Sequence, residues 1–558
     1  MDTTEQPRLA DPVLRARLVV PLAEPAAFPL TLLGQLLRLS AALIVWVAVF
    51  KLSGQASHTL AMMPNGLFVK LIQLTVPGLA ASLAAYALFR PWNALVAILA
   101  LMPVYNAAYV SWQVGNLQVI LQTIFVLALA AGAITSTTAT RSLPRPAASR
   151  IATRRTTGFL AFRLAEVAAA GFVGIAILST AASHNATLSS TVLLHGILEP
   201  VALGALVIYM RPSRRDLVVL CVALGLAISI GTVMNIVQML PTASTFAAMQ
   251  ANRLAFAHAS FYNVGLFAVA AATIIPLGVA AFAARRSLQL PLWATATIAM
   301  SFGLGLAGLF LSFSKSAWLA AAFAIVLVMV LIIKTWRRRI ALVFASALVS
   351  TVLIPWPALF LQVAPAVNAE YRTVMVSLVG ESRFDSWNPE TLAGRGSLTE
   401  RFYAVDAGVR MALANPIFGV GLDQFGPNYW NPAYRPAAAL DGLDHAHSFF
   451  PEVAAELGLI AAVFAFVIYA AALWTMLRIY RRAKDQLTRV LAAGLAAAIV
   501  AWLVVATAFG CFIYRPTLDL SSDVVASAVI LAAAIALARL VDAEKRLSFA
   551  EATRSLYG

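Results

Sequence analysis

Charged residues and cysteines are scarce in this chain of 558 residues. Each scarcity excludes some classes of protein. Only 11% of the residues are charged and 61% are hydrophobic, whereas soluble domains carry about 25% charged residues. The two cysteines, Cys221 and Cys511, both stand in apolar runs, which argues against a disulfide framework and against a zinc site. The composition therefore excludes an ordinary soluble protein.

Several motifs of soluble enzymes are also absent from the sequence. It contains no GxxxxGK[ST] phosphate loop, no HExxH and no CxxC, which argues against ATP hydrolysis and against metal catalysis by this chain. The stretch GLGLAG, residues 303–308, matches GxGxxG but lies inside an apolar run. Because a dinucleotide site needs a strand before this motif and a helix after it, we interpret these glycines as a place of close helix packing.

Long apolar runs, by contrast, recur along nearly the whole chain. Each is long enough to cross a hydrocarbon core of about 30 Å as a helix. The runs are continuous and do not alternate with polar residues, so helices are predicted and strands are not. We predict an all-α polytopic membrane protein with about fourteen spans, within a range of about twelve to fourteen. The predicted spans are 30–50, 68–89, 91–110, 117–139, 163–182, 190–209, 217–240, 263–283, 290–312, 317–333, 340–360, 449–474, 490–513 and 523–541.

Lysine and arginine cluster in alternate loops between these spans. The clusters are residues 141–155, 211–215, 285–286, 334–339 and 478–484. Cytoplasmic loops carry the excess of these residues, so we predict that these loops and both termini are cytoplasmic. The net charge of +16 is then a topology signal that also suits anionic lipid head groups, and it does not indicate nucleic-acid binding.

One predicted external loop is much longer than the other loops, and long ordered loops are usually functional. It divides the chain into unequal parts. We predict a cytoplasmic tail 1–29, N-terminal spans 30–240 with a basic cytoplasmic linker 141–162, central spans 241–360, the partly helical external loop 361–446, C-terminal spans 447–541 and a cytoplasmic tail 542–558.

The long loop contains one strong helical pattern. Apolar residues recur at helical spacing over residues 396–416, which predicts a helix there. Arg401 stands in its first turns, and Asp406 and Arg410 have the i,i+4 spacing of an ion pair. The glycines of the turn PIFGVG, residues 416–421, permit a close approach of another backbone.

Two of the six histidines, His445 and His447, stand one residue apart where the loop meets the next apolar run. His447 is compatible with a helix N-terminal cap and with a functional group. Arg401 is compatible with a solvated helix face and with a functional group. The loop by itself leaves both alternatives open.

Other cations stand near the external ends of predicted spans. The stretch ANRLAFAHASFYN contains Arg253 and His258, and LSFSKSAW contains Lys315. Lys315 could extend its ammonium group to the membrane surface at little cost. The alternative is that Arg253, Lys315 and Arg401 converge on one anion. Guanidinium groups suit a diphosphate because they form bidentate hydrogen bonds with it.

Two further pairs have more than one interpretation. His195 and Glu199 are spaced i,i+4 inside one predicted span and are compatible with a proton relay or with a buried structural pair. We favour the structural pair, because no other ionisable residue accompanies them in that span. Arg515 and Asp519, in the last external loop, either line a cavity or pair with each other.

Four stretches together resemble the O-antigen ligases and related polysaccharide polymerases of the bacterial inner membrane. NRLAFAHASFYNVGLF resembles the family's Arg–x–x–Gly…Asn–x–x–Ala stretch, and LSFSKSAWLA resembles its Ser–Arg–Gly–Ala–Trp motif. RFYAVDAGVRMALANPIFGVGLDQF resembles its Arg-led helix followed by Pro–x–x–Gly–x–Gly, and HSFFPEVAAELGLIAA its His–Asn–x–x–Leu…Glu–x–Gly signature. The likeness covers roughly residues 250–475. This chain departs from the pattern at Ala255, Lys315 and Ser448, where members commonly have Gly, Arg and Asn.

The resemblance implies a membrane glycosyltransferase that uses neither metal nor nucleotide and has no cofactor. Its donor would be a glycan on a polyprenyl diphosphate such as undecaprenyl diphosphate. Its acceptor would be a hydroxyl of a glycan or glycolipid, including lipopolysaccharide, at the periplasmic face of the inner membrane. The resemblance implies that Arg253, Lys315 and Arg401 bind the diphosphate and that His447 is the general base. The candidate supporting residues are His445, His258, Glu456 and Arg410.

Two other functions stay open. A polymerase that joins polysaccharide repeat units shares the same motifs. A secondary transporter or a flippase for lipid-linked glycans would suit about fourteen spans and the His195–Glu199 pair. Transporters usually show repeats and broken helices near the middle of the membrane, whereas the cations here stand at external ends of spans.

Overall fold

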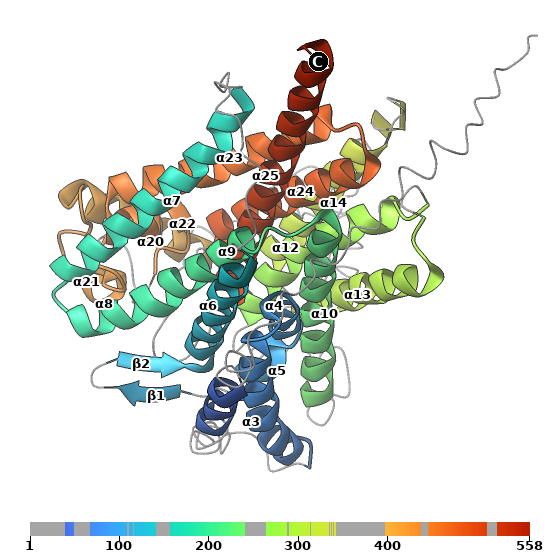
Figure 1. Ribbon diagram of the computed structural model, residues 1–558. Coiled ribbons are helices and arrows are strands. Elements are labelled where there is room, and N and C mark those ends of the chain that lie inside the picture. The colour runs from blue at the N-terminus through green and yellow to red at the C-terminus, as the bar shows by residue number, and fades with distance from the viewer. Residues whose placement is uncertain are drawn as a thin grey trace, which may run out of the picture.

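The computed structural model is described for residues 39–49, 67–108, 111–114, 117–140, 157–239, 264–286, 289–312, 314–333, 335, 337–338, 340–341, 397–436, 445–509 and 522–557. These residues form a bundle of helices with one short hairpin (Figure 1). The N-terminal elements are α3 (Leu67–Ala87), α4 (Pro91–Ala100), α5 (Met102–Ala108), β1 (Ser111–Val114), β2 (Leu117–Ile120), α6 (Leu121–Thr140), α7 (Thr157–Ala182), α8 (Ala186–Val192), the π-helix η2 (Leu193–Leu198), α9 (Glu199–Tyr209) and α10 (Arg214–Met239).

The second half of the described chain contains no strand. Its elements are α12 (Val264–Ala283), α13 (Leu292–Leu311), α14 (Lys315–Ile332), α20 (Ser397–Ala414), α21 (Phe425–Tyr429), α22 (Phe449–Leu457), α23 (Leu459–Arg482), α24 (Gln486–Phe509) and α25 (Ser522–Tyr557).

The helical class predicted from the sequence is confirmed, with β1 and β2 as the exception. They pair antiparallel, with Trp112 opposite Val119. SWQV alternates polar and apolar residues throughout and LQVI does so over its first three residues, which is the period of a strand. The helix predicted for 117–139 therefore begins at Leu121.

Eight helices in the described part of the chain are long and apolar enough to span a membrane. The predicted number of about fourteen stays a prediction, since the predicted span 340–360 lies almost wholly outside the described residues. Five shorter apolar helices accompany the eight: Leu39–Val49, Thr75–Ala87, Pro91–Ala100, Leu121–Thr135 and Ser316–Ile332. The eight are Phe162–Ala182, Ala186–Tyr209, Arg214–Val237, Gly265–Ala283, Leu292–Leu311, Leu459–Arg482, Gln486–Thr507 and Val524–Arg546.

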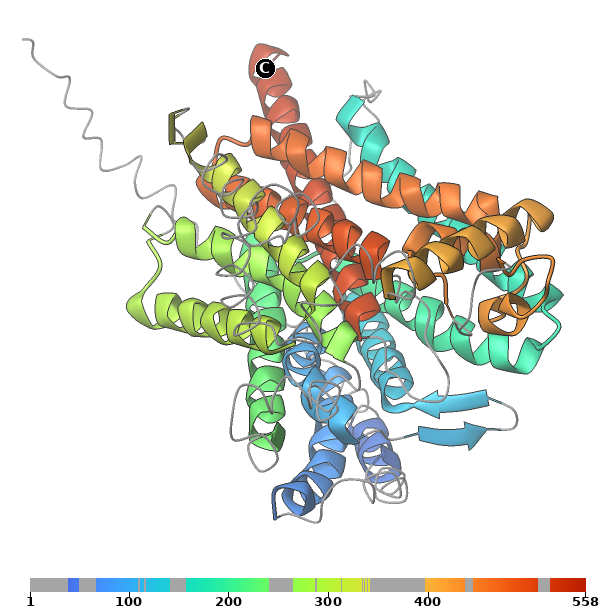
Figure 2. The ribbon, with the colours of Figure 1, turned by 180° about the vertical axis from the view of Figure 1, so that it is seen from behind.

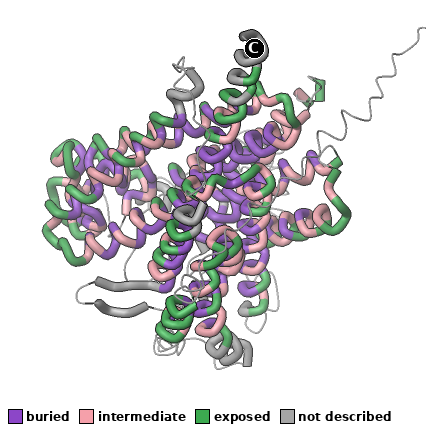
Figure 3. Tube along the Cα trace, viewed as in Figure 1, coloured by how far each residue is buried: buried purple, intermediate pink, exposed green. Residues whose placement is uncertain are grey.

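Small residues let the central helices pack closely. The buried core, which lies at the centre of the molecule in Figure 3, includes long runs of alanine in α12, α24 and α25. A Cβ atom added to Gly308 of α13 would lie 2.2 Å from Thr232 Oγ1 and 2.7 Å from Phe267 Cζ. The interpretation of GLGLAG as a close packing site is confirmed at this glycine.

One end of the bundle gathers ion pairs between helices that are distant in sequence. Arg214, which begins α10, lies 2.5 Å from Glu544 of α25 and 3.6 Å from Asp485, just before α24. Near the start of α7, Glu166 accepts two hydrogen bonds from Arg539 of α25. The predicted cytoplasmic loops 211–215 and 478–484 therefore lie at the same end, as the charge pattern requires. Which membrane face this end occupies stays a prediction.

The predicted span 449–474 is wrong at its start. Two helices replace it, because α22 ends at Leu457 and α23 begins at Leu459. Gly458, between them, has φ 89° and ψ 166°, a conformation that is essentially restricted to glycine. The membrane-spanning helix thus begins at Leu459, and α22 belongs with the loop that precedes it.

Candidate functional site

A small folded unit precedes α23, and we call it the 397–457 unit (residues 397–436 and 445–457). It contains α20, α21 and α22 and lies beside α7, α8 and the start of α23 (Figure 1, Figure 2). The helix predicted over residues 396–416 is confirmed as α20. The unit has its own buried cluster, formed by Ala404, Ala407, Met411, Phe425, Tyr429, Ala446 and Ala455.

The turn PIFGVG is joined to the end of α22 by backbone hydrogen bonds, and we call this junction the clasp (residues 416–421 with 455–459). Val420 N donates to Ala455 O at 2.8 Å, and Gly421 N donates to Glu456 O at 3.1 Å. Leu459 N donates to Pro416 O at 2.8 Å. The turn thereby satisfies carbonyl groups that the last turn of any helix leaves without an intrahelical donor.

The glycines of two motifs make this junction possible. A Cβ atom on Gly419 would lie 2.3 Å from the carbonyl carbon of Glu456, and one on Gly458 would lie 2.3 Å from Ile417 O. Both glycines also have positive φ angles, 67° and 89°. Side chains at these positions would therefore separate the two backbones. The sequence signatures Pro–x–x–Gly–x–Gly and Glu–x–Gly are two halves of one contact.

Glu456 binds the clasp with its side chain. Its two carboxyl oxygens accept hydrogen bonds from Asp423 N and Phe425 N, both at 3.0 Å. Burial, together with the nearby charge of Asp423, raises the pKa of Glu456 to about 8, although the two backbone donors act to lower it. Glu456, a candidate supporting residue, thus holds the loop that leads into α21.

We expect the clasp to weaken as the pH rises, because of Glu456. An unfolded glutamate has a pKa near 4.3, whereas the folded value is about 8. Between these values the unfolded chain releases a proton that the folded chain keeps, so the free energy of unfolding falls as the pH rises through this window. Thermal unfolding of the purified protein at pH 5 and pH 8 measures this dependence. Glu456→Gln should flatten it, and identical pH profiles for the two proteins would contradict the raised pKa.

Serine hydroxyls of the N-terminal half attach the unit to the bundle. Ser179 Oγ, near the end of α7, lies 2.7 Å from Phe418 O and 2.9 Å from Glu456 O. Ser189 Oγ of α8 donates to Leu422 O at 2.6 Å. The sequence did not reveal these contacts, because serines in apolar helices are common and backbone carbonyls leave no mark in a sequence.

Aromatic rings fix the start of α22 against the membrane helices. Phe449 is buried, with its ring centroid 4.9 Å from that of Trp502 in α24 and 6.0 Å from that of Tyr469 in α23. The rings of Tyr469 and Trp502 are stacked at 4.3 Å. The backbone that follows His447 is therefore held in place by the bundle.

The histidine pair lies at this anchored point. The ring centroids of His445 and His447 are 4.0 Å apart, and both residues are half-buried. His447 has a φ angle of 52°, which is uncommon for any residue other than glycine. Such strained backbones are frequent at functional sites. Ser448 is the N-cap residue of α22, so the interpretation of His447 as the cap is wrong.

Arg401 belongs to the same unit as the histidine pair. It is half-buried and stands one turn before Ala404, which packs in the buried cluster with Ala446. Farther along α20, a Cβ atom on Gly408 would lie 3.4 Å from the Cβ atom of Ala446. The helix that carries Arg401 therefore packs along the loop that carries His447.

The structure does not place the other predicted site residues beside the histidine pair. Arg410 lies on the exposed side of α20 and pairs with Asp406 at 2.7 Å, which confirms the predicted i,i+4 ion pair. Lys315 is the first residue of α14, and its side chain lies outside the described part of the structure. Arg253 and His258 also lie outside the described residues, as do Arg515 and Asp519.

The His195–Glu199 pair is buried in the membrane-spanning stretch Ala186–Tyr209. His195 Nδ1 lies 3.0 Å from Glu199 Oε1, and Thr123 of α6 donates a hydrogen bond to the same oxygen. His195 is part of the π-helix η2. The contacts tie α9 to α6, in keeping with the structural interpretation. Among the described residues, no group of three or more His, Cys, Asp or Glu side chains could hold a metal ion.

Comparison with known proteins identifies the segment that contains this unit. Residues 298–466 match a family model described as O-antigen ligase. This segment is therefore similar to the O-antigen ligase family. The match begins in α13, includes Lys315, Arg401 and His447, and ends within α23. A search of curated proteins finds no match. The apolar helices indicate a multi-pass membrane protein, and residues 298–466 of it are similar to the O-antigen ligase family.

Proposed function

We propose that the chain transfers a glycan from a polyprenyl-diphosphate carrier to an acceptor hydroxyl at the periplasmic face of the inner membrane, as an O-antigen ligase does. One observation carries the proposal. The segment that matches the O-antigen ligase family folds the Arg401 helix and the His445–His447 pair into one unit, clasped to the start of a membrane helix. A lipid-borne donor would be reached from such a position.

Cations perform the first task of this mechanism. Arg401, with Arg253 and Lys315, binds the diphosphate of the donor and stabilises the negative charge that grows on it as the bond to the sugar breaks. Diphosphate is a good leaving group, so the step requires neither a nucleotide nor a metal ion. Lys315 supplies a point charge where the family commonly has the planar fork of arginine.

His447 performs the second task. Its imidazole accepts the proton of the acceptor hydroxyl while the hydroxyl oxygen forms the new bond to the anomeric carbon. The bond between that carbon and the phosphate oxygen breaks, and polyprenyl diphosphate leaves with the electron pair. The strained backbone at His447 and the anchored Phe449 keep the imidazole in a fixed position. His445, whose ring contacts that of His447, orients it.

A polymerase of the same superfamily would use the same groups with another lipid-linked glycan as acceptor. Loss of the gene separates the two functions. We expect a strain without a ligase to accumulate long polymer on the lipid carrier, as gel electrophoresis of carrier-linked glycan would show. A strain that instead makes chains of a single repeat unit would show that the protein is a polymerase.

A transporter or flippase is the second class of candidate. The buried His195–Glu199 pair in the π-helix is the observation that favours it. Thr123 and His195 both contact the Glu199 carboxyl group and tie helices together, which is the behaviour of a structural pair. We therefore propose glycan transfer and not transport.

A further inference from the structure

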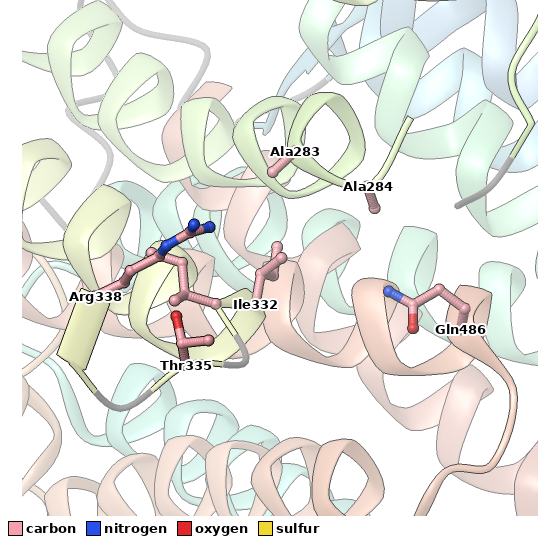
Figure 4. Close-up of a pocket in the computed structure, with 7 residues that line it drawn as sticks. Ala283, Ala284, Ile332, Thr335, Arg338 and Gln486 are labelled. Carbon is pink, nitrogen blue, oxygen red and sulfur yellow. The ribbon is translucent and has the colours of Figure 1, made fainter. Parts of the chain in front are cut away.

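Two neighbouring cavities lie at the end of α23 remote from the 397–457 unit. The first has a volume of about 370 Å³ and the second about 300 Å³. Ile332 and Gln486 line both cavities, so the two adjoin. In Figure 4, Arg338 and Gln486 stand on opposite sides of the first cavity, with Ile332 between them. The second cavity is lined by Tyr480, Arg481, Arg489 and Val490 among others.

The cavities lie where membrane helices end. Ala283 is the last residue of α12, and Ile332 is the last residue of α14. Tyr480 stands in the last turn of α23, and Gln486 begins α24. Because α12, α23 and α24 are long and apolar enough to cross the hydrocarbon core, their ends lie at the depth of the lipid head groups. Each cavity therefore has an apolar wall toward the membrane core.

The polar side of the cavities is positively charged. Arg338 and Arg481 are exposed residues that line the first and the second cavity. Arg489 lines the second cavity and donates one hydrogen bond to Ala483 O at 2.8 Å. The neighbouring carboxylate, Asp485, accepts a hydrogen bond from Thr488 N at 2.7 Å and forms an ion pair with Arg214. An anion in these cavities would therefore contact guanidinium groups. The carboxylate in the link between α23 and α24, Asp485, is already paired.

We propose that the two cavities together bind the phosphate head group of an anionic phospholipid from the adjoining leaflet. Basic pockets between membrane helices on the cytoplasmic side suit such head groups, and this end carries the basic loops predicted to be cytoplasmic. The lipid phosphate meets Arg338 and Arg481, and the acyl chains follow the apolar wall at Ala283 and Ile332. The site lies at the opposite end of α23 from His447, and the proposal does not rest on glycan transfer.

The test compares two double variants with the same loss of charge. Arg338→Gln with Arg481→Gln removes two arginines that line the cavities. Arg337→Gln with Arg482→Gln removes their exposed sequence neighbours, which line neither cavity. Native mass spectrometry of the purified full chain measures binding of phosphatidylglycerol, with phosphatidylcholine as the neutral reference. The first variant should bind phosphatidylglycerol about 30-fold more weakly than the wild type, and the second within about three-fold of it.

Three results would overturn the proposal. Equal losses in both double variants would show a general attraction of charged loops for anionic lipid and no defined site. Retention of phosphatidylglycerol by Arg338→Gln with Arg481→Gln would show that the cavities are not used. Displacement of the lipid by an equal concentration of inorganic phosphate would show a site for a free anion and not for a lipid head group.

Discussion

Replacing His447 by asparagine is expected to lower the rate of glycan transfer by about 10²- to 10⁴-fold, which is what a positioned general base contributes. Asparagine tolerates the left-handed backbone found at His447, whose φ is 52°, so the loop should keep its conformation. Alanine would remove the imidazole and also strain the backbone. The measurement is the initial rate of glycan transfer by the purified variant, with a thermal unfolding curve to show that it is folded.

His445→Asn is the matched control for this substitution. The same side-chain change is made two residues away, in a ring that contacts the first. We expect a much smaller loss for His445→Asn, because in the proposed mechanism that ring orients the base and does not accept the proton. If His447→Asn transferred glycan at the parental rate, the assignment of the base would be wrong. If only His445→Asn lost activity, His445 would be the base.

Gly458→Ala is expected to abolish glycan transfer, because the substitution disrupts the clasp. The added Cβ atom would lie 2.3 Å from Ile417 O and 2.5 Å from Ile417 C, both backbone atoms. To avoid this clash, the turn must move away and break the hydrogen bond from Leu459 N to Pro416 O. The φ of 89° with ψ of 166° adds a conformational penalty, and together we expect a loss of at least about 2 kcal/mol of stability in the 397–457 unit.

Hydrogen exchange measures this effect locally. Amides of residues 417–421 and 455–459 should exchange faster in Gly458→Ala, while the helices of the bundle should keep their protection. Gly303→Ala in α13 is the control, since no neighbouring atom lies within 4 Å of the added Cβ atom. That variant should transfer glycan at the wild-type rate. Normal protection of the clasp in Gly458→Ala would contradict its role in joining the two backbones.

The parts of the site that depend on local sequence could be predicted. Apolar spacing over residues 396–416 gave α20 to within two residues of each end, because a helix that packs on one face repeats its apolar residues with the helical period. The Asp406–Arg410 pair followed from the same period. His445 and His447 were recognisable because histidine is rare in this chain and only Ala446 separates the two.

The parts that depend on distant contacts could not be predicted. Ser179 and Ser189 hold Phe418 and Leu422 through backbone carbonyl groups, which no residue pattern records. The break at Gly458 was hidden because the apolar run continues through it, and hydropathy does not register a change of φ. The sequence did contain one sign of this break. Glu452 and Glu456 place two acidic residues in the first part of the predicted span 449–474, where a membrane helix rarely has them. Both are buried in α22 instead.

The central claim is that cations and an imidazole in this protein cleave the bond between a glycan and a lipid-borne diphosphate. The most direct measurement follows both products in one reaction. Purified protein is mixed with polyprenyl-diphosphate glycan and acceptor, without nucleotide, and mass spectrometry quantifies glycosylated acceptor and released polyprenyl diphosphate. We predict equimolar products from the wild type and none above background from Arg401→Gln. Intact donor that crosses the bilayer of proteoliposomes without release of polyprenyl diphosphate would contradict the claim.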